Sequence, residues 1–370
     1  MKVNTANEKL KRKYLNWLKD GEGYSEITVR AVERAICVFE DSTNHAEFKT
    51  YSERQALGFK KWLGRPKAKG ESVATSTKYH YLRHVQKFFK WLKTQPGYKT
   101  RIHLDAVSYL SLDKKSVRDA LSPRPRRWPS LNYVLELTGS IAVRNEIDQR
   151  DRALIAFLLL SGMRYTAICT LSLACFDVAE LTINQDRRLG VKTKAGKVIT
   201  TRLFPFHEKL LEYVLGWVAY LAKTKSFEPG QPLFPRTKME QEEGGLSFVA
   251  NKVEPVFWSG GNSIREILKR RSEQARLEYY NPHAFRHAAV HIASQYCVTP
   301  EQFKAVSQNL GHEHVATTLK TYGMLDDHRV GDVLSEIDFV TRPGSPSESI
   351  PATDLEAFIK KYTKKGLTRS

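Results

Sequence analysis

The segment that decides the fold is residues 281–287, which read Asn-Pro-His-Ala-Phe-Arg-His. Proline is favoured in the first turn of a helix, where its missing N–H is not needed, so Pro282 indicates a helix start. His283 and Arg286 then lie three residues apart and project from adjacent turns toward one spot. A single element therefore supplies a proton-handling group and an anion clamp.

A second arginine lies in the turn between two expected helices. Residues 161–165 read Ser-Gly-Met-Arg-Tyr and follow a strongly apolar segment over 151–160. That segment predicts a buried helix, which ends near Gly162 because glycine readily terminates helices. Arg164 is therefore expected in the turn before the next helix.

Lysines lie between these two motifs. Residues 192–197 read Lys-Thr-Lys-Ala-Gly-Lys and fall among short β-like runs over 181–206. This pattern of short β-like runs around the lysine segment predicts a β-hairpin with lysines at its tip. Lys194 is the preferred candidate for chemistry, and Lys192 and Lys197 are alternatives because the choice depends on the hairpin register.

A histidine and a tyrosine complete the pattern late in the chain. Residues 310–312 read Leu-Gly-His, and Tyr322 follows His312 by ten positions. In the order Arg, Lys, His-x-x-Arg, His, Tyr, these motifs resemble the tyrosine recombinase family, which includes the phage integrases. Each motif is weak alone, and the resemblance rests on their conjunction in one basic chain. The helical front part, which ends in Phe88–Leu92, resembles the core-binding domain of the family.

Two departures from the family pattern concern the surroundings of the site. Ala167 stands three positions after Arg164, where the family often has an acidic residue, so the support of this arginine differs. The spacing from His312 to Tyr322 is one residue longer than in many members. Tyr322 is nevertheless the only tyrosine between Tyr296 and Tyr362, and it remains the expected nucleophile.

The chemistry implied is DNA strand transfer. A phosphodiester under attack gathers negative charge on its nonbridging oxygens, which fixed cations stabilise. A guanidinium fork holds two phosphate oxygens at once, and we assign Arg164 and Arg286 this role. A phenol with a reference pKa of about 10 is a weak nucleophile, but two nearby arginines favour the phenolate of Tyr322. A 3′-phosphotyrosine keeps the energy of the broken bond, so no ATP, metal or other cofactor is expected.

The remaining site residues would handle protons. The leaving 5′-oxygen must be protonated as it departs, and Lys194 on the hairpin would deliver that proton. By the resemblance, His283 would assist proton transfer at the tyrosine, and His312 would hydrogen-bond the phosphate and help position the nucleophile. His287 matches a histidine often found in the family, for which structural support is the expected role.

The composition favours a polyanionic partner. The 370 residues include 59 Lys and Arg against 40 Asp and Glu, a formal net charge of +19, which favours nucleic acid through release of its counterions. No run approaches the ~18 apolar residues of a membrane helix, and the charged start of the chain is unlike a secretion signal. We therefore expect a cytoplasmic, nucleoid-associated protein. Its four cysteines form no CxxC pair and are expected to be reduced core thiols.

We predict a mainly α fold with a small β-sheet, in which two domains form a clamp on DNA as in the family. The expected parts are a helical core-binding domain over 1–121, a basic linker over 122–130, a catalytic domain over 131–335, and a tail with a short helix over 336–370. Four or five helices are expected before Gly97, the last capped by Thr75 or Ser76. A loop rich in Gly, Pro, Glu and Gln is expected over 228–245.

Candidate DNA-binding residues lie on the last front helix and in the linker; they are Lys87, Lys90, Arg124, Arg126 and Arg127. Double-stranded recombination sites are the expected substrate, bound by a homotetramer whose protomers contact each other through the C-terminal tail. Accessory directionality proteins are further candidate partners. Two other functions fit the same residues: a DNA-relaxing enzyme similar to type IB topoisomerases, and a noncatalytic, sequence-specific DNA-binding protein on the same scaffold.

Overall fold

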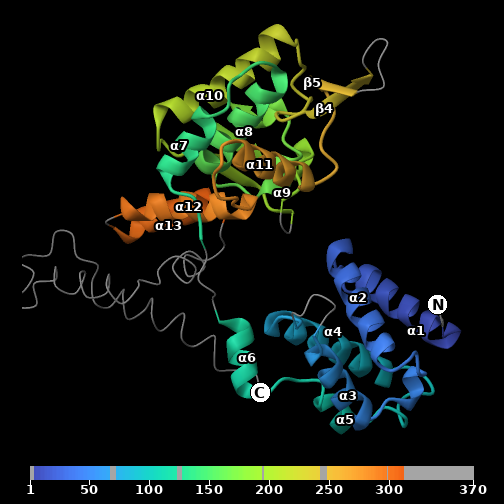
Figure 1. The fold of residues 1–370 in the computed structure, drawn as a ribbon. Coiled ribbons are helices and arrows are strands. Elements are labelled where there is room, and N and C mark those ends of the chain that lie inside the picture. The colour runs from blue at the N-terminus through green and yellow to red at the C-terminus, as the bar shows by residue number, and fades with distance from the viewer. Residues whose placement is uncertain are drawn as a thin grey trace, which may run out of the picture. The chain divides into compact units, whose positions relative to one another are not determined.

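A computed structural model describes residues 4–66, 72–122, 127–193, 196–241, 248–297 and 299–311 of the chain. The chain divides into two compact units, Met1–Pro125 and Arg126–Ser370, and each is described by itself (Figure 1). The mainly helical fold with small antiparallel sheets confirms the predicted fold class. The predicted C-terminal helix and tail lie outside the described residues. None of the described helices combines the length and the apolar character needed to cross a membrane.

The first unit is a bundle of helices around an aromatic core. Its helices are α1 Thr5–Asn16, α2 Glu26–Ser42, α3 Glu53–Gly64, α4 Thr75–Lys93, α5 Leu104–Ser108 and α6 Lys114–Leu121. Phe39 of α2 packs edge-on against Phe59 of α3 and Phe89 of α4, with ring centroids 5.2 Å apart in both pairs. Edge-to-face packing is the favoured geometry for aromatic pairs, so these rings join three helices into one core.

The start of α4 corrects the predicted cap. The helix begins at Thr75, and Ala74 occupies the cap position, so neither Thr75 nor Ser76 is the cap. Ala74 has no side-chain acceptor, and the first turn is closed by the backbone bond from Lys78 N to Ala74 O at 2.9 Å. The threonine and the serine therefore lie inside the first turn instead of before it.

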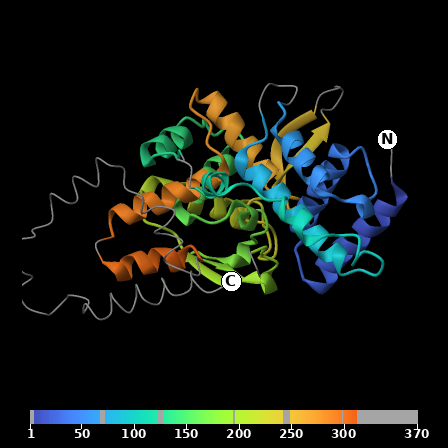
Figure 2. The same cartoon turned by 90° about the horizontal axis from the view of Figure 1, so that it is seen from below.

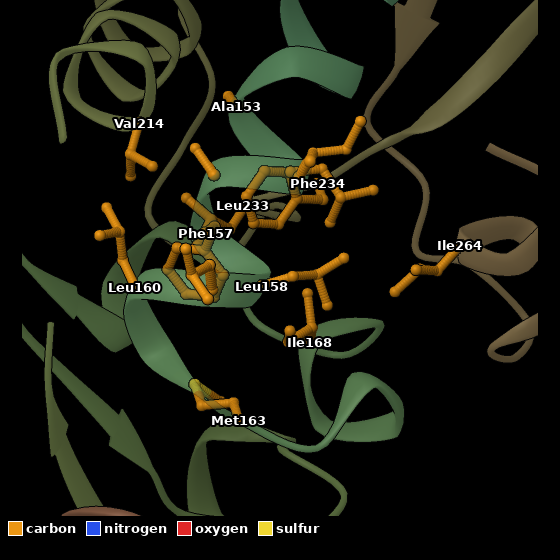
Figure 3. Packing of buried hydrophobic residues seen from close by; sticks show 14 of the residues in the cluster. Ala153, Phe157, Leu158, Leu160, Met163, Ile168, Val214, Leu233, Phe234 and Ile264 are labelled. Atoms are coloured by element: carbon orange, nitrogen blue, oxygen red, sulfur yellow. The ribbon is translucent and has the colours of Figure 1, made fainter. Parts of the chain in front are cut away.

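The second unit surrounds the long helix α8. Its elements are α7 Leu131–Gly139, α8 Glu146–Ser161, α9 Tyr165–Ile168, β1 Phe176–Asp177, β2 Thr182–Gln185, β3 Ile199–Arg202, α10 Glu208–Ala219, β4 Arg236–Gln241, β5 Phe248–Glu254, α11 Asn262–Gln274, α12 Pro282–Gln295 and α13 Pro300–Asn309. Phe157 and Leu158 of α8 lie in a cluster with Val214 of α10, Ile264 of α11, and Phe234 from the segment before β4 (Figure 3). α12 and α13 lie next to each other in both ribbon views (Figures 1 and 2).

Helix α8 begins earlier than the apolar run over 151–160 predicted. The side chain of Asn145 caps it by accepting a bond from Asp148 N at 2.9 Å. The first turns carry charged side chains that are buried, among them Asp148 and Asp151. Arg271 of α11 satisfies both carboxylates, donating to Asp148 at 2.7 Å and to Asp151 at 2.9 Å. Buried carboxylates with such partners are tolerated in a core, so the apolar pattern alone underestimates the length of this helix.

A three-stranded antiparallel sheet has the order β1-β2-β3 and contains the predicted hairpin. β2 pairs with β3 from Thr182 opposite Arg202 to Gln185 opposite Ile199, and the lysine segment lies in the connection between them. The described part of the connection also includes a short 3-10 helix over Arg187–Leu189.

The predicted loop over 228–245 is partly wrong, because it contains strand β4, which pairs antiparallel with β5. Two bonds from α8 hold the base of this β4–β5 hairpin. Arg150 Nη1 donates to Thr237 Oγ1 at 2.9 Å, and Val253 N donates to Glu146 Oε2 at 2.7 Å. Polar and flexible residue types in this segment hide a strand whose stability comes from contacts with α8.

Candidate functional site

The structure describes some of the predicted site residues and not others. Arg164, His283, Arg286 and Arg127 are described in the second unit, and Lys87 and Lys90 in the first. The remaining predicted site residues lie outside the described residues; they are Lys194, His312, Tyr322, Arg124 and Arg126. The site can therefore be built only from the segments that lead to them.

Arg286 connects the three motif segments. It lies in the second turn of α12 and is only 3% exposed. Its Nη1 donates to the carbonyl of Gly162 at 2.8 Å, and its Nη2 donates to the carbonyl of Leu310 at 2.9 Å. Gly162 is two residues before Arg164, and Leu310 is two residues before His312. One guanidinium thus holds together turns that are far apart in the sequence.

The start of α12 positions the histidine motif. Asn281 is the cap, and its side-chain oxygen accepts bonds from His283 N at 3.0 Å and Ala284 N at 3.2 Å. Pro282 occupies the first turn, as the sequence predicted. The exposed His283 and the buried His287 are one helical turn apart, with ring centroids 4.6 Å apart and planes at 78°. His283 therefore reaches the surface at the same helix end from which Arg286 points inward.

Arg164 is half-buried at the cap position of α9. The preceding Gly162 ends α8 with a φ of +55°, a conformation that glycine adopts without strain. Tyr165 lies on Gly261, whose backbone leaves no room for a side chain, and its hydroxyl accepts a bond from Arg265 Nη2 at 2.6 Å. These contacts fix the turn that carries Arg164.

Ala167, which stands where the family often has an acidic residue, is buried in the apolar core. A small apolar side chain suits this place, because Ala167 is only 2% exposed. The support that a carboxylate would give to Arg164 is therefore not supplied from this position.

The strand after the lysine segment packs on Gly311 and bonds to Asn309. Gly311 has a φ of +68°, and a Cβ at this position would come within 2.9 Å of Ile199 Cγ1 in β3. Asn309 accepts a bond from Arg202 N at 2.7 Å and donates to Arg202 O at 2.9 Å. The buried Thr201 donates to the Asn309 carbonyl at 2.8 Å. The end of α13 is therefore tied to β3, and so to the segment that leads to Lys194.

The lysine segment itself is partly described. Thr193 Oγ1 donates to the carbonyl of Lys197 at 2.7 Å. Lys192 N donates to Thr170 Oγ1 at 2.9 Å and so joins the segment to the end of the α9 turn. The hairpin connection therefore contacts the element that follows Arg164.

The first unit carries a basic stripe on α4, which we define as His80, Arg83, Lys87 and Lys90. These residues recur at steps of three and four and are exposed, and α4 contains no acidic residue. Burial, together with the neighbouring positive charges, lowers the pKa of the adjacent His84. Arg83, Lys87 and Lys90 give the stripe positive charge at neutral pH, which suits the phosphates of a nucleic acid.

Several residues that shape the site were not singled out from the sequence. Asn281 and Asn309 act through caps and backbone bonds, and asparagine before a proline or before Leu-Gly is the only local signal for them. Gly261 and Arg265 are distant in sequence from Arg164, and their contact with Tyr165 depends on how α11 packs.

Comparison with known proteins gives a consistent result. The sequence pattern described as the phage integrase family matches residues 134–329. The tyrosine recombinase XerC of Bacillus pumilus is 22% identical over 323 residues, which cover 85% of this chain and 91% of that protein. The protein of the same name from Actinobacillus succinogenes is 26% identical over 195 residues, or 51% of this chain and 54% of that protein.

Two solved structures share the fold at low sequence identity. A lambda integrase dimer bound to a COC′ core site has a TM-score of 0.58 at 11% identity, covering 93% of this chain and 98% of that chain. The Tn1549 transposon integrase in complex with a circular intermediate DNA has a TM-score of 0.55 at 16% identity, covering 89% and 99%. At such identities the likeness concerns the fold alone.

Proposed function

The chain belongs to the phage integrase family, and we propose that it is a site-specific DNA recombinase that cuts and rejoins strands through a 3′-phosphotyrosyl link to Tyr322. The observation that carries the proposal is the position of Arg286. Its guanidinium bonds the turns that lead to Arg164 and to His312, so a single cation organises the motif segments. The meeting of these turns at one charged group supports a shared site.

The two described bonds of Arg286 are to neutral groups. Backbone carbonyls carry no net charge, so the two bonds orient the guanidinium without neutralising it. With Arg164 on the adjoining turn, it would stabilise the charge that gathers on the phosphate oxygens under attack.

The proposed proton transfers use residues at the edge of this centre. The exposed His283 would accept the proton of the Tyr322 hydroxyl as its oxygen attacks phosphorus, and His312 would hydrogen-bond the phosphate. Lys194 would protonate the 5′-oxygen as its bond to phosphorus breaks. A 5′-hydroxyl of a second strand then displaces the tyrosine, so the number of phosphodiester bonds is conserved and ATP is not needed.

Double-stranded DNA is the proposed substrate. The basic stripe on α4, which includes Lys87 and Lys90, supports contact with the backbone because phosphate contacts position a protein without reading sequence. Arg124, Arg126 and Arg127 are proposed to add contacts from the linker. We further propose a homotetramer on DNA, joined through the C-terminal tail, with accessory directionality proteins, acting in the cytoplasm.

The direct test is covalent capture. A suicide substrate made from repeat sequences that flank the gene is incubated with the protein, and products are separated on a denaturing gel. The proposal predicts a protein-linked DNA band that Tyr322→Phe abolishes, because phenylalanine has no oxygen to attack phosphorus. A band that survives in the Tyr322→Phe protein would assign the nucleophile elsewhere, and DNA binding without any band would favour the noncatalytic alternative.

A further inference from the structure

A cavity at the start of α12 is lined in part by Arg127, which comes from the segment before α7. The cavity is about 350 Å³ in volume and is lined by Arg127, Asn281, His283, Ala284 and His287. All of these residues belong to the unit Arg126–Ser370. Because His283 faces the same space, an anion in this cavity would lie beside the proposed reacting phosphate.

The backbone of Arg127 is held in place by its neighbour. The Trp128 ring lies 5.0 Å from the ring of His291 on α12 and packs against the apolar core. Two residues later, the Ser130 side chain caps α7 by accepting a bond from Tyr133 N at 3.1 Å. The Arg127 side chain is 84% exposed, so it combines a fixed origin with freedom to move.

Arg127 has an acidic partner that a phosphate can replace. Its Nη1 lies 3.6 Å from Glu278 Oε1, a long contact between exposed groups, and such pairs contribute little to stability. Glu278 is held more firmly. Its carboxylate accepts a bond from Tyr280 OH at 3.1 Å, and its backbone carbonyl accepts one from Tyr133 OH at 2.5 Å. The arginine is therefore the movable member of the pair.

We propose that Arg127 binds a backbone phosphate next to the scissile one, and that Glu278 is its counter-ion until DNA arrives. A guanidinium bonds a phosphate through two parallel N–H groups, which is stronger than the single long contact with Glu278. The carboxylate of Glu278 is negative and lies near Arg127, so it also repels a phosphate that approaches this arginine. The location next to the scissile phosphate rests on the proposed function, and the proposal makes specific the DNA contact that is proposed there for Arg127.

The test measures the salt dependence of DNA binding. The probe is a short synthetic duplex of arbitrary sequence, and the affinity of the full-length protein is followed by fluorescence anisotropy over a range of salt concentrations. Loss of one phosphate contact lowers the slope of log K against log salt by about 0.9, so Arg127→Ala is expected to show this decrease and Arg127→Lys to restore most of it. Arg202→Ala is the matched control, because Arg202 also forms an exposed pair with a glutamate, Glu180, and does not line the cavity.

The acidic partner has its own comparison. Glu278→Gln and Glu180→Gln remove the same charge, but only the first is expected to tighten binding, by about two- to five-fold. Equal effects of the two glutamine variants would overturn the role of Glu278. An unchanged slope for Arg127→Ala would overturn the phosphate contact, even in a protein whose Tyr322 forms the covalent link. A reduced slope in a protein that forms no such link would retain the contact and remove only the proposed function.

Discussion

Two turns of the second unit are alike in their backbone and differ in what surrounds them. Helix α8 ends at Gly162 and helix α13 ends just before Gly311, and both glycines have positive φ. A backbone carbonyl of each turn accepts a bond from Arg286. The two turns also touch, because a Cβ on Gly162 would lie only 2.7 Å from Leu310 Cδ2. The first turn belongs to the centre of the core, because α8 is buried along most of its length. The second ends a mostly exposed helix, and it is held by the buried Leu310, by the packing of Gly311 on Ile199 and by the bonds between Asn309 and β3.

The difference shows how one site combines rigidity with adjustability. A turn that is part of the core cannot shift without disturbing many apolar contacts, so the position of Arg164 is fixed by folding itself. A turn at the end of a mostly exposed helix can shift at a smaller cost, and it is the turn that leads to His312 and Tyr322. Changes at the Gly162 turn should therefore affect stability, and changes at the Gly311 turn should affect cleavage more than stability.

The largest effect is expected when both turns lose their common donor. Arg286→Lys keeps the charge, but one ammonium cannot span the two carbonyls, so DNA cleavage should fall by on the order of 10²–10³. The free energy of unfolding should fall by roughly 1–3 kcal/mol, because at least one buried carbonyl loses its partner. Suicide-substrate cleavage and denaturant unfolding measure the two effects. Wild-type cleavage by a folded but destabilised Lys variant would show that the guanidinium organises the fold and not the site.

The next effect separates backbone strain from crowding at the first turn. Gly162→Ala should lower the free energy of unfolding by about 2–4 kcal/mol, because alanine is strained at positive φ and its Cβ meets Leu310 and, at 3.2 Å, Ala289. Gly190→Ala is the matched control: its φ is +80° and its Cβ would meet nothing within 4 Å, so only the strain of about 1 kcal/mol remains. Denaturant unfolding of the two variants gives the comparison. Equal losses would mean that the Gly162 turn is no more crowded than a surface loop.

The same two turns show how far the sequence could predict the molecule. The apolar run and the following glycine predicted the end of α8, because both depend on local pattern and backbone conformation. The beginning of α8 was predicted too late, since the burial of Asp148 and Asp151 depends on arginines more than a hundred residues away. The β4–β5 hairpin was missed for a related reason, because Glu146 and Arg150 of α8 hold it in place.

For the site, residue types and order predicted the participants but not their contacts. The sequence singled out Arg286 as a phosphate clamp, yet its two described bonds are to backbone carbonyls, which every residue possesses. No sequence pattern distinguishes the carbonyls of Gly162 and Leu310 from any others. Arg286 bonds these two carbonyls because of how α8, α12 and α13 pack. In the same way, Arg127 pairs with Glu278 because of the path that the chain takes before α7.

The smallest effect concerns the bonds that hold the second turn to the sheet. Asn309→Ala removes the side-chain bonds to both backbone groups of Arg202, which lie at the exposed edge, so the free energy of unfolding should fall by only about 1–2 kcal/mol. Cleavage should nevertheless fall by roughly ten-fold, because a shift of the turn displaces the residues that follow Gly311 from their working positions. Asn184→Ala is the control, since Asn184 is an exposed residue of the same sheet whose side chain accepts a bond from Thr200 at 3.3 Å and does not contact α13. If both variants cleave equally well at matched stability, the bonds from Asn309 serve only folding, and the two turns differ in their surroundings but not in their roles.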